Sequence, residues 1–144
     1  DGELETTIQK LIEKNRRDTE RKEQHNQELR LDAGDKSKYI MDAIAYVDEN
    51  YANPNISVRA VADHLGISEG HLSHLFRKET DSTLMAFVTK RRMRAAMSML
   101  QDYRHKVYEV AEQVGYRNIT YFSATFKKYV GVSPSEYQDR YSPE

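Results

Sequence analysis

The sequence predicts an all-α fold in which two helix-turn-helix subdomains are joined by a long central helix and preceded by a charged helical linker. Two observations support this prediction. The segment 61–80 returns in related form at 110–129, and each copy reads as a short helix, a turn centred on a glycine and a second helix. Between the copies, the stretch 83–101 carries its apolar residues at helical spacing.

Residues 1–36 differ from the rest, and we interpret them as a charged linker helix or tail. The segment has one short apolar stripe, made of Leu4, Ile8, Leu11 and Ile12. No large apolar residue follows between 13 and 28, and mixed charges at i,i+4 spacing favour an exposed helix. A coiled-coil joint between protomers is the alternative, although about one heptad of apolar contacts is too short for it alone. The stretch around Gly34 indicates a break.

The domain 37–144 begins with a helix that runs from Lys38 to about Tyr51. Its apolar stripe consists of Tyr39, Ile40, Ala43, Ile44 and Val47. Ser57 is suited to cap the next helix, Gly66 to make the tight turn, and Ser68 to cap the helix after it. This arrangement predicts a first helix-turn-helix over 57–80.

A long linking helix follows over 83–101, with Ser82 or Thr83 as its cap, and a second helix-turn-helix over 107–130. Ser133-Pro-Ser-Glu136 is a capping box with proline at the first helical position. It predicts a short last helix through Tyr137. The domain is therefore expected to contain seven helices and no strand.

The composition excludes several classes of protein. The chain contains no cysteine, which rules out disulfides, thiolate-ligated zinc and thiol catalysis. No run of about 18 apolar residues is present, so we expect no membrane contact from this segment. The start of the chain lacks the basic and apolar regions of a signal peptide, and we expect a cytoplasmic protein. Because the first residue is not Met, we interpret the chain as a piece of a longer protein.

The charge is unevenly distributed, although the net charge of the chain is only −1. Residues 67–130 contain 11 Lys/Arg and 6 Asp/Glu, a net charge of +5, whereas the remainder is acidic. A basic block inside a nearly neutral chain is what a surface facing nucleic acid requires.

The second helix of each repeat has an apolar face and a free face. Leu72, Leu75 and Phe76 point inward in the first copy, and Phe122, Phe126 and Tyr129 in the second. The free faces consist of Gly70, Ser73, His74 and Arg77 in the first copy and Thr120, Ser123, Ala124 and Lys127 in the second. Small polar side chains allow a close approach to base edges, and long cations suit phosphates.

Further candidates for phosphate contact lie at helix starts and in the linking helix. Ser68, Arg117 and Asn118 are placed where backbone N–H groups and the helix dipole favour an anion. Lys90 and Arg91 belong to a basic cluster at 90–94, which is also typical of a solvated helix face. The complete set of phosphate candidates is Ser68, Arg77, Lys90, Arg91, Arg117, Asn118 and Lys127.

Other groups of residues are interpreted as structural. His71 and His74 are three residues apart, but no third ligand completes a metal site. The tyrosines at 116, 121, 129 and 137 are interpreted as core edges. The sequence shows no nucleophile–base pair, glycine-rich phosphate loop or paired catalytic carboxylates, so we expect no catalytic residue, metal or cofactor.

The second repeat resembles a known family. The run Ala111-Glu-Gln-Val-Gly-Tyr, together with Tyr121-Phe-Ser and the stretch from Phe126 to Tyr137, is similar to the signature of AraC/XylS-type transcriptional regulators. The resemblance extends back through 71–80 and covers about 38–141. It implies two helix-turn-helix subdomains that each place one recognition helix in successive major grooves of double-stranded DNA.

At the matching positions, the resemblance implies base contacts by Gly70, Ser73 and His74 in the first copy and by Thr120, Tyr121 and Ala124 in the second. Many members carry Arg where this chain has His74 and Ala124. Arginine binds guanine bidentately, worth about 1–3 kcal/mol of discrimination, whereas alanine offers at most a contact to a thymine methyl group. We therefore expect the first helix to specify sequence more and the second to position the protein more.

The leading hypothesis is sequence-specific binding of double-stranded DNA and transcription regulation, without enzymatic activity. The resemblance implies RNA polymerase as a partner and a regulatory domain outside this segment, either sugar-binding or a receiver domain of a two-component system. A stand-alone regulator with only the two motifs is the alternative. Dimerisation through that domain or through the N-terminal helix stays open. The alternative function is a helical protein-interaction or signalling module that uses the N-terminal helix. An enzyme with an accessory helix-turn-helix domain is disfavoured, because the enzymes of that kind require a reactive cysteine.

Overall fold

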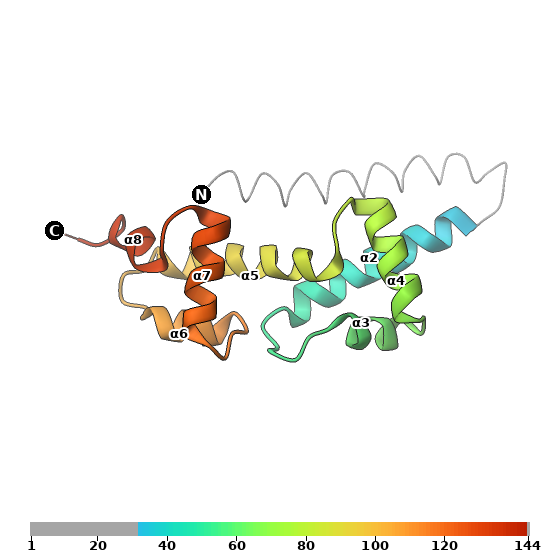
Figure 1. The fold of residues 1–144 in the computed structure, drawn as a ribbon, viewed down its shortest axis with the longest axis horizontal. Helices are drawn as coiled ribbons and strands as arrows, with labels where there is room; N and C mark the ends of the chain where they lie inside the picture. The colour runs from blue at the N-terminus through green and yellow to red at the C-terminus, as the bar shows by residue number, and fades with distance from the viewer. Residues whose placement is uncertain (1–31, 144) are drawn as a thin grey trace.

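The computed structural model describes residues 32–143, and every regular element in that range is an α-helix. In chain order the helices are α2 (Asp32–Asn50), α3 (Val58–Leu65), α4 (Glu69–Thr80), α5 (Leu84–Leu100), α6 (Val107–Gln113), α7 (Ile119–Val130) and α8 (Pro134–Asp139). Figure 1 shows α5 lying between a group formed by α2, α3 and α4 and a group formed by α6, α7 and α8. The all-α fold with a long central helix is therefore confirmed.

Residues 1–31 of the charged linker expected over 1–36, and with them its coiled-coil alternative, lie outside the described residues. The break expected around Gly34 is wrong, because α2 begins at Asp32 and continues through Gly34. Glycine lowers the stability of a helix by about 1 kcal/mol relative to alanine, but it keeps the N–H donor that proline lacks. A helix that is stabilised downstream by packing therefore tolerates it.

Four helices begin at capping residues that the sequence predicts, whereas Asn118 was expected only as a phosphate contact and caps α7 as well. The side-chain oxygen of each cap accepts a hydrogen bond from the backbone N–H three residues later, and the caps are Ser57, Ser68, Thr83, Asn118 and Ser133. Thr83 rather than Ser82 therefore caps α5. At α6 the N-cap is Lys106, whose backbone N–H donates to the Glu109 carboxylate at 3.1 Å. Each cap satisfies one of the donors that a helix start leaves unpaired.

The hydrophobic core is divided into two clusters. The first is built by α2, α3, α4 and the start of α5, and its fully buried side chains include Ile40, Leu72, Phe76 and Phe87. The second is built by the remainder of α5 with α6, α7 and α8, and it includes Met93, Leu100, Phe122 and Phe126. On α5 the first core ends at Val88 and the second begins at Met93. Four polar residues, 89–92, separate them.

We call the region between the two cores the waist, and define it as residues 89–92 of α5, the loop 51–55 and the turn 115–117. Arg92 is its central residue and is only 9% exposed. Its Nε donates to the Tyr51 carbonyl at 2.7 Å and its Nη2 to the Asn53 carbonyl at 3.0 Å. The guanidinium also lies 5.0 Å from the centre of the Tyr116 ring, a cation–π contact. The sequence analysis placed Arg92 in a basic cluster at 90–94 that could face solvent or DNA, and this assignment is wrong for Arg92 because the side chain is buried.

Gly115 allows the close approach of Arg92 to the second helix-turn-helix. Its φ is +109°, and a Cβ atom added there would lie 2.9 Å from Arg92 Nε. Gly131 also has a positive φ, of +102°, but open space surrounds the position of its missing Cβ. A side chain at 115 would therefore meet both backbone strain and the guanidinium, whereas one at 131 would meet strain alone.

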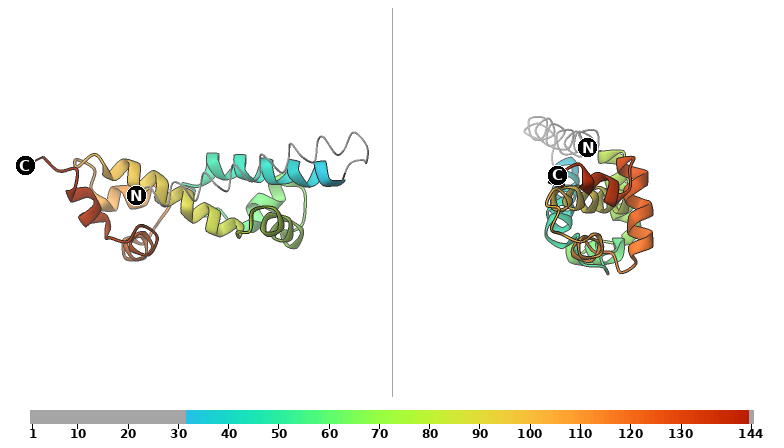
Figure 2. Two further views of the ribbon diagram at one scale, coloured as in Figure 1. Left: turned by 90° about the horizontal axis from the view of Figure 1, so that it is seen from above. Right: turned by 90° about the vertical axis from the view of Figure 1, so that its left-hand side faces the viewer.

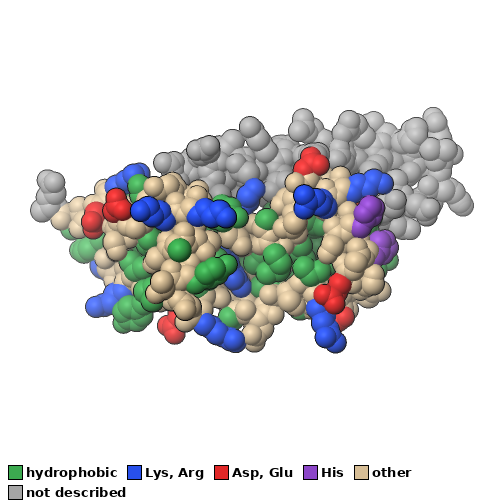
Figure 3. All heavy atoms as spheres, in the orientation of Figure 1, with side chains coloured by type: hydrophobic (Ala, Val, Ile, Leu, Met, Phe, Trp, Pro, Cys, Tyr) green, Lys and Arg blue, Asp and Glu red, His purple; other side chains and the backbone are tan. Residues whose placement is uncertain are grey.

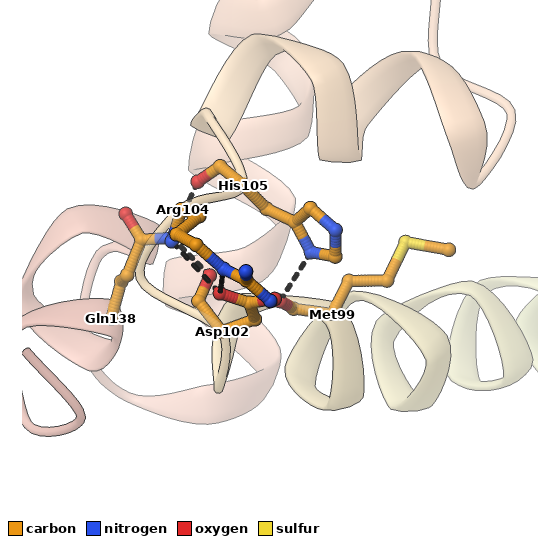
Figure 4. A network of polar contacts seen from close by, with 5 residues as sticks. All are labelled: Met99, Asp102, Arg104, His105 and Gln138. Atoms are coloured by element: carbon orange, nitrogen blue, oxygen red, sulfur yellow. Dashed lines mark hydrogen bonds and ion pairs between the residues drawn. The ribbon is translucent and has the colours of Figure 1, made fainter.

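A network of polar contacts holds the connection between α5 and α6 (Figure 4). The backbone N–H and Nε of Arg104 donate to Asp102 Oδ1, both at 3.0 Å, and Nη2 donates to Oδ2 at 2.9 Å. Gln138 of α8 donates to the carbonyls of His105 at 2.6 Å and Asp102 at 3.3 Å. His105 Nδ1 lies 2.9 Å from the Met99 carbonyl and carries the proton in that contact, since a carbonyl only accepts. The network fixes α8 and the entry to α6 against the end of α5.

We expect Gly115→Ala to destabilise the fold more than Gly131→Ala. Both variants incur backbone strain of about 1–2 kcal/mol from the left-handed conformation. Gly115→Ala also displaces Arg92, and a clash of this kind adds about 1–3 kcal/mol. Urea unfolding of both variants beside the parent chain measures the difference. Equal losses would show that Arg92 moves aside at no cost.

The Asp102 contacts predict a pH dependence of stability in the acidic range. Hydrogen bonds from Arg104 hold the pKa of the Asp102 carboxyl well below its ordinary value of 3.8. A carboxyl whose pKa is lower in the folded state stabilises the fold above pH 3.8, and this contribution is lost as the pH falls toward the folded-state pKa. The difference in free energy of unfolding between the parent chain and Asp102→Asn should therefore shrink on acidification below pH 3.8. A difference that is constant with pH would contradict this assignment.

Candidate nucleic-acid interface

The second helices of the two repeats, α4 and α7, lie on the same face of the molecule. The view from above in Figure 2 shows both of them end-on and on the same side of α5. In Figure 1 both run from bottom to top, so they are roughly parallel and point the same way. Each helix has the length, 12 residues, that a recognition helix needs to present about three turns.

Helix α4 is fixed to the first core through its apolar face. Leu72, Leu75 and Phe76 are at most 1% exposed, as the sequence predicts. The candidate base-contacting residues Gly70, Ser73 and His74 and the phosphate candidate Arg77 are all exposed. Position 70 has open space around its missing Cβ. The helix therefore presents a small polar surface followed by cations in its last turn.

Helix α7 is fixed to the second core by Phe122 and Phe126, which are fully buried, and by the half-buried Tyr129. The candidate base-contacting residues Thr120, Tyr121 and Ala124 are exposed, whereas Ser123 is half-buried. The last turn carries Lys127 and Lys128, which matches the position of the cations on α4. Figure 3 shows Lys and Arg side chains gathered over the upper ends of both helices.

Tyr121 is more exposed than the other tyrosines that the sequence analysis interpreted as core edges. Tyr116 and Tyr137 are 7% and 3% exposed, but Tyr121 is 63% exposed. Its ring centre lies 5.8 Å from that of Tyr116, so the ring rests on the core with one face toward solvent. Beside it, Thr89, Ala124, Thr125 and Lys128 line a hollow of about 290 Å³. The reading of Tyr121 as a core edge is thus wrong, because the first turn of α7 extends beyond the packed layer.

Five of the phosphate candidates surround the two recognition helices as exposed residues: Ser68, Arg77, Arg117, Asn118 and Lys127. Ser68 and Asn118 use their side-chain oxygens as helix caps, at 3.1 Å and 3.0 Å from the N–H groups of His71 and Tyr121. The Ser68 hydroxyl hydrogen and the Asn118 amide remain as donors. Arg117 donates from Nη2 to Asn55 Oδ1 at 2.8 Å, which joins the second turn to the loop after α2.

The structure places Lys90 and Arg91 differently. Lys90 is half-buried. Arg91 is 20% exposed and forms an ion pair with Asp48, in which Nε lies 2.7 Å from Oδ1. The geometry of this contact does not make it a hydrogen bond. Its guanidinium also lies 5.8 Å from the centre of the Tyr51 ring. Arg91 thus faces α2 and an adjacent hollow of about 550 Å³ that Arg94 also lines, and its charge is held there by Asp48.

Sequence reasoning missed the residues of the waist. Arg92 was grouped with its basic neighbours, and Asn55, which ends the Asn-Pro-Asn stretch before Ser57, was given no functional role. One signal for Arg92 was available, because it lies four residues after Val88 and four before Ala96, on the buried stripe of α5. Burial raises the pKa of the neighbouring Tyr116 hydroxyl and the charge of Arg92 opposes the shift, so the ring stays neutral beneath the cation.

Within residues 32–143 no group of three histidines or carboxylates is placed to hold a metal ion. His71 and His74 are both exposed on α4. None of the helices in this part of the chain is both long and apolar enough to cross a membrane.

Comparisons with known proteins identify the family. Residues 61–140 match the model of the family described as a helix-turn-helix domain. The arabinose operon regulatory protein of Escherichia coli is 32% identical over 69% of this chain and 34% of its own length. The uncharacterized transcriptional regulatory protein YesN of Bacillus subtilis is 36% identical over 71% of this chain and 28% of its own length. The chain thus spans about a third of the length of these curated relatives.

A solved structure resembles the fold closely. The C-terminal domain of AraT, a response regulator from Geobacillus stearothermophilus, has 30% sequence identity and a TM-score of 0.70, and the match covers 74% of this chain and 88% of that one. The match therefore spans most of that domain. On the strength of the family match and this similarity, the chain belongs to the AraC-type helix-turn-helix family.

Proposed function

We propose that this domain binds double-stranded DNA sequence-specifically, with α4 and α7 in two successive major grooves, and thereby regulates transcription. The observation that carries the proposal is the exposure of two parallel recognition helices on one face. An α-helix fits the major groove, and successive major grooves recur on one face of the duplex after about 10 base pairs. Membership in the AraC-type family supports the same function.

The proposed base contacts are Gly70, Ser73 and His74 from α4 and Thr120, Tyr121 and Ala124 from α7. All six are exposed and lie in the first two turns of their helices. His74 offers a ring nitrogen to a base edge, whereas Ala124 offers only a methyl group. Tyr121 adds an exposed ring that suits an apolar contact to a thymine methyl group. The first helix therefore contributes more hydrogen-bond specificity than the second.

The proposed phosphate contacts are Ser68, Arg77, Arg117, Asn118 and Lys127. They lie at the start and the end of the recognition helices and keep free donors. Lys90, which is half-buried on α5, is a sixth proposed phosphate contact. Arg91 is left out of this set because Asp48 holds its guanidinium on the α2 side of α5. The phosphate contacts supply most of the affinity and make it depend on salt, whereas the base contacts supply the sequence preference.

The wider context of the domain belongs to the same proposal. We assign residues 37–144 to the DNA-binding domain and 1–36 to a linker toward a regulatory domain of a larger bacterial regulator. The similarity to the C-terminal domain of a response regulator favours a two-component member. RNA polymerase is the proposed partner on DNA and the cytoplasm is the proposed location. The domain is proposed to act by binding, without catalysis or a cofactor.

Selection of bound sites from a random duplex library with the full chain, at two salt concentrations, tests the proposal. We expect one asymmetric motif with two half-sites about 10 base pairs apart. A motif of a single half-site would show that α7 contacts phosphates without reading bases. Failure to bind any duplex would overturn the proposal and favour the protein-interaction module.

Substitutions at His74 and Lys127 should separate base reading from phosphate binding. His74→Ala should lower affinity for the selected sequence by about 1–3 kcal/mol and change the preferred bases beneath α4. Lys127→Ala should weaken selected and random duplexes alike and reduce the slope of log K against log salt by about 1. His71→Ala, an exposed histidine on the same helix, is the control for His74. Equal losses on selected and random DNA for both variants would contradict the assignment of His74.

A further inference from the structure

The two recognition helices are attached to different hydrophobic cores. Helix α4 packs into the first core and α7 into the second, and these cores are separate clusters. Because α5 contributes to both, this helix of 17 residues, about 25 Å long, limits how far the two halves can move along its axis. It does not by itself fix how the second half is tilted against the first, since each half packs on its own stretch of the helix. Contacts across the waist are needed for that.

Arg92 makes those contacts from the middle of the waist. Two of its donors bind carbonyls of the loop that follows α2, those of Tyr51 and Asn53. Its guanidinium plane faces Tyr116 in the turn that leads into α7, where Gly115 leaves room for it. One side chain on α5 therefore touches both the loop after α2 and the turn before α7. That turn positions the first residues of the second recognition helix, which are its proposed reading end.

A second contact acts between the same two segments. The guanidinium of Arg117 donates to the Asn55 side chain at 2.8 Å, beside the Arg92 contacts. Arg117 is exposed, so this bond is weaker in water than the buried contacts of Arg92. The two contacts together connect the loop 51–55 to the turn 115–117.

We propose that Arg92 is a positioning residue that fixes α7 relative to α4 and thereby restricts DNA binding to one separation of the two half-sites. The inference rests on the proposed function, because it concerns the geometry of the same interface. Arg92 itself is too buried to reach DNA and acts through the loop and the turn that it joins.

The separation of half-sites is a sensitive measure of this geometry. Inserting one base pair moves a half-site by about 3.4 Å along the duplex and turns it by roughly 35° about the axis. A rigid waist cannot follow that rotation, so either α7 loses its base contacts or the DNA must be deformed. Without Arg92 the second half can change its orientation relative to α5, and α7 can then keep part of its base contacts at the altered separation.

The test measures affinity of the full chain for duplexes that carry the selected half-sites at the selected separation, one base pair shorter and one base pair longer. The parent chain should lose about tenfold or more in affinity at either altered separation. Arg92→Met removes the donors but keeps an unbranched apolar side chain, and its loss should fall to about threefold or less. Arg92→Lys should relax the separation in the same way, since an ammonium lacks the planar fork that spans both carbonyls.

Two further variants complete the design. Arg94→Met removes a half-buried cation two residues along α5 that lines the α2 side of the helix, and its separation profile should equal that of the parent chain. Asn55→Ala removes the partner of Arg117 without removing a cation, and it should relax the separation to a smaller degree than Arg92→Met. Circular dichroism at the assay temperature establishes that each variant is folded. If Arg92→Met fails to fold, the separation profiles of Arg92→Lys and Asn55→Ala test the proposal in its place.

The outcomes separate this inference from the proposed function. A parent chain that enriches no sequence and binds no duplex would overturn the proposed function. A parent chain that binds the selected half-sites equally at all three separations would overturn the role of the waist alone. The same follows if the Arg92 variants lose affinity by one factor at every separation, because that pattern reflects lower stability and not altered geometry.

Discussion

The arrangement of this domain depends on one buried guanidinium. Arg92 lies where the apolar residues of α5 are interrupted, because no residue between Val88 and Met93 is apolar and the two cores are separate clusters. Burying a charge is costly unless its donors are satisfied. Two carbonyls at 2.7 Å and 3.0 Å and an aromatic face provide that compensation here. Because both carbonyls belong to a loop and the ring to a turn, the contact also orders two segments that lack regular structure.

Because the waist is polar, the two halves are held together differently from the halves of a protein with one continuous hydrophobic core. Each half keeps its own closely packed interior, which fixes each recognition helix within its own subdomain. The orientation between the halves depends instead on directional hydrogen bonds, which have defined lengths and angles. The few hydrogen bonds of the waist therefore set the relative orientation of the two recognition helices. The bond from Arg117 to Asn55 joins the same two segments, and the ion pair of Arg91 with Asp48 holds α5 against α2.

The proposed interface combines a few side chains suited to base contacts with local positive charge. The whole chain is nearly neutral, yet the last turns of both recognition helices carry adjacent cations. Local charge decides the attraction to phosphate, since screening limits interactions beyond about 10 Å. The two helices differ in what they offer to bases. Helix α4 presents serine and histidine, whereas α7 presents threonine, an exposed tyrosine ring beside a hollow, and alanine.

The sequence by itself determined the helices, most of their caps and the inward faces of both recognition helices. These features follow from local rules, because helical periodicity and capping involve residues within four positions of each other. It misjudged Gly34, where the packing of α2 outweighs a local propensity, and Tyr121, whose exposure depends on where the packed layer ends. Only the tertiary structure decided that Arg92 is buried and Arg91 is paired with Asp48, while the neighbouring Lys90 and Arg94 are half-buried. The partners of Arg92 lie 41 and 39 residues away in the chain, a separation at which no local pattern carries information.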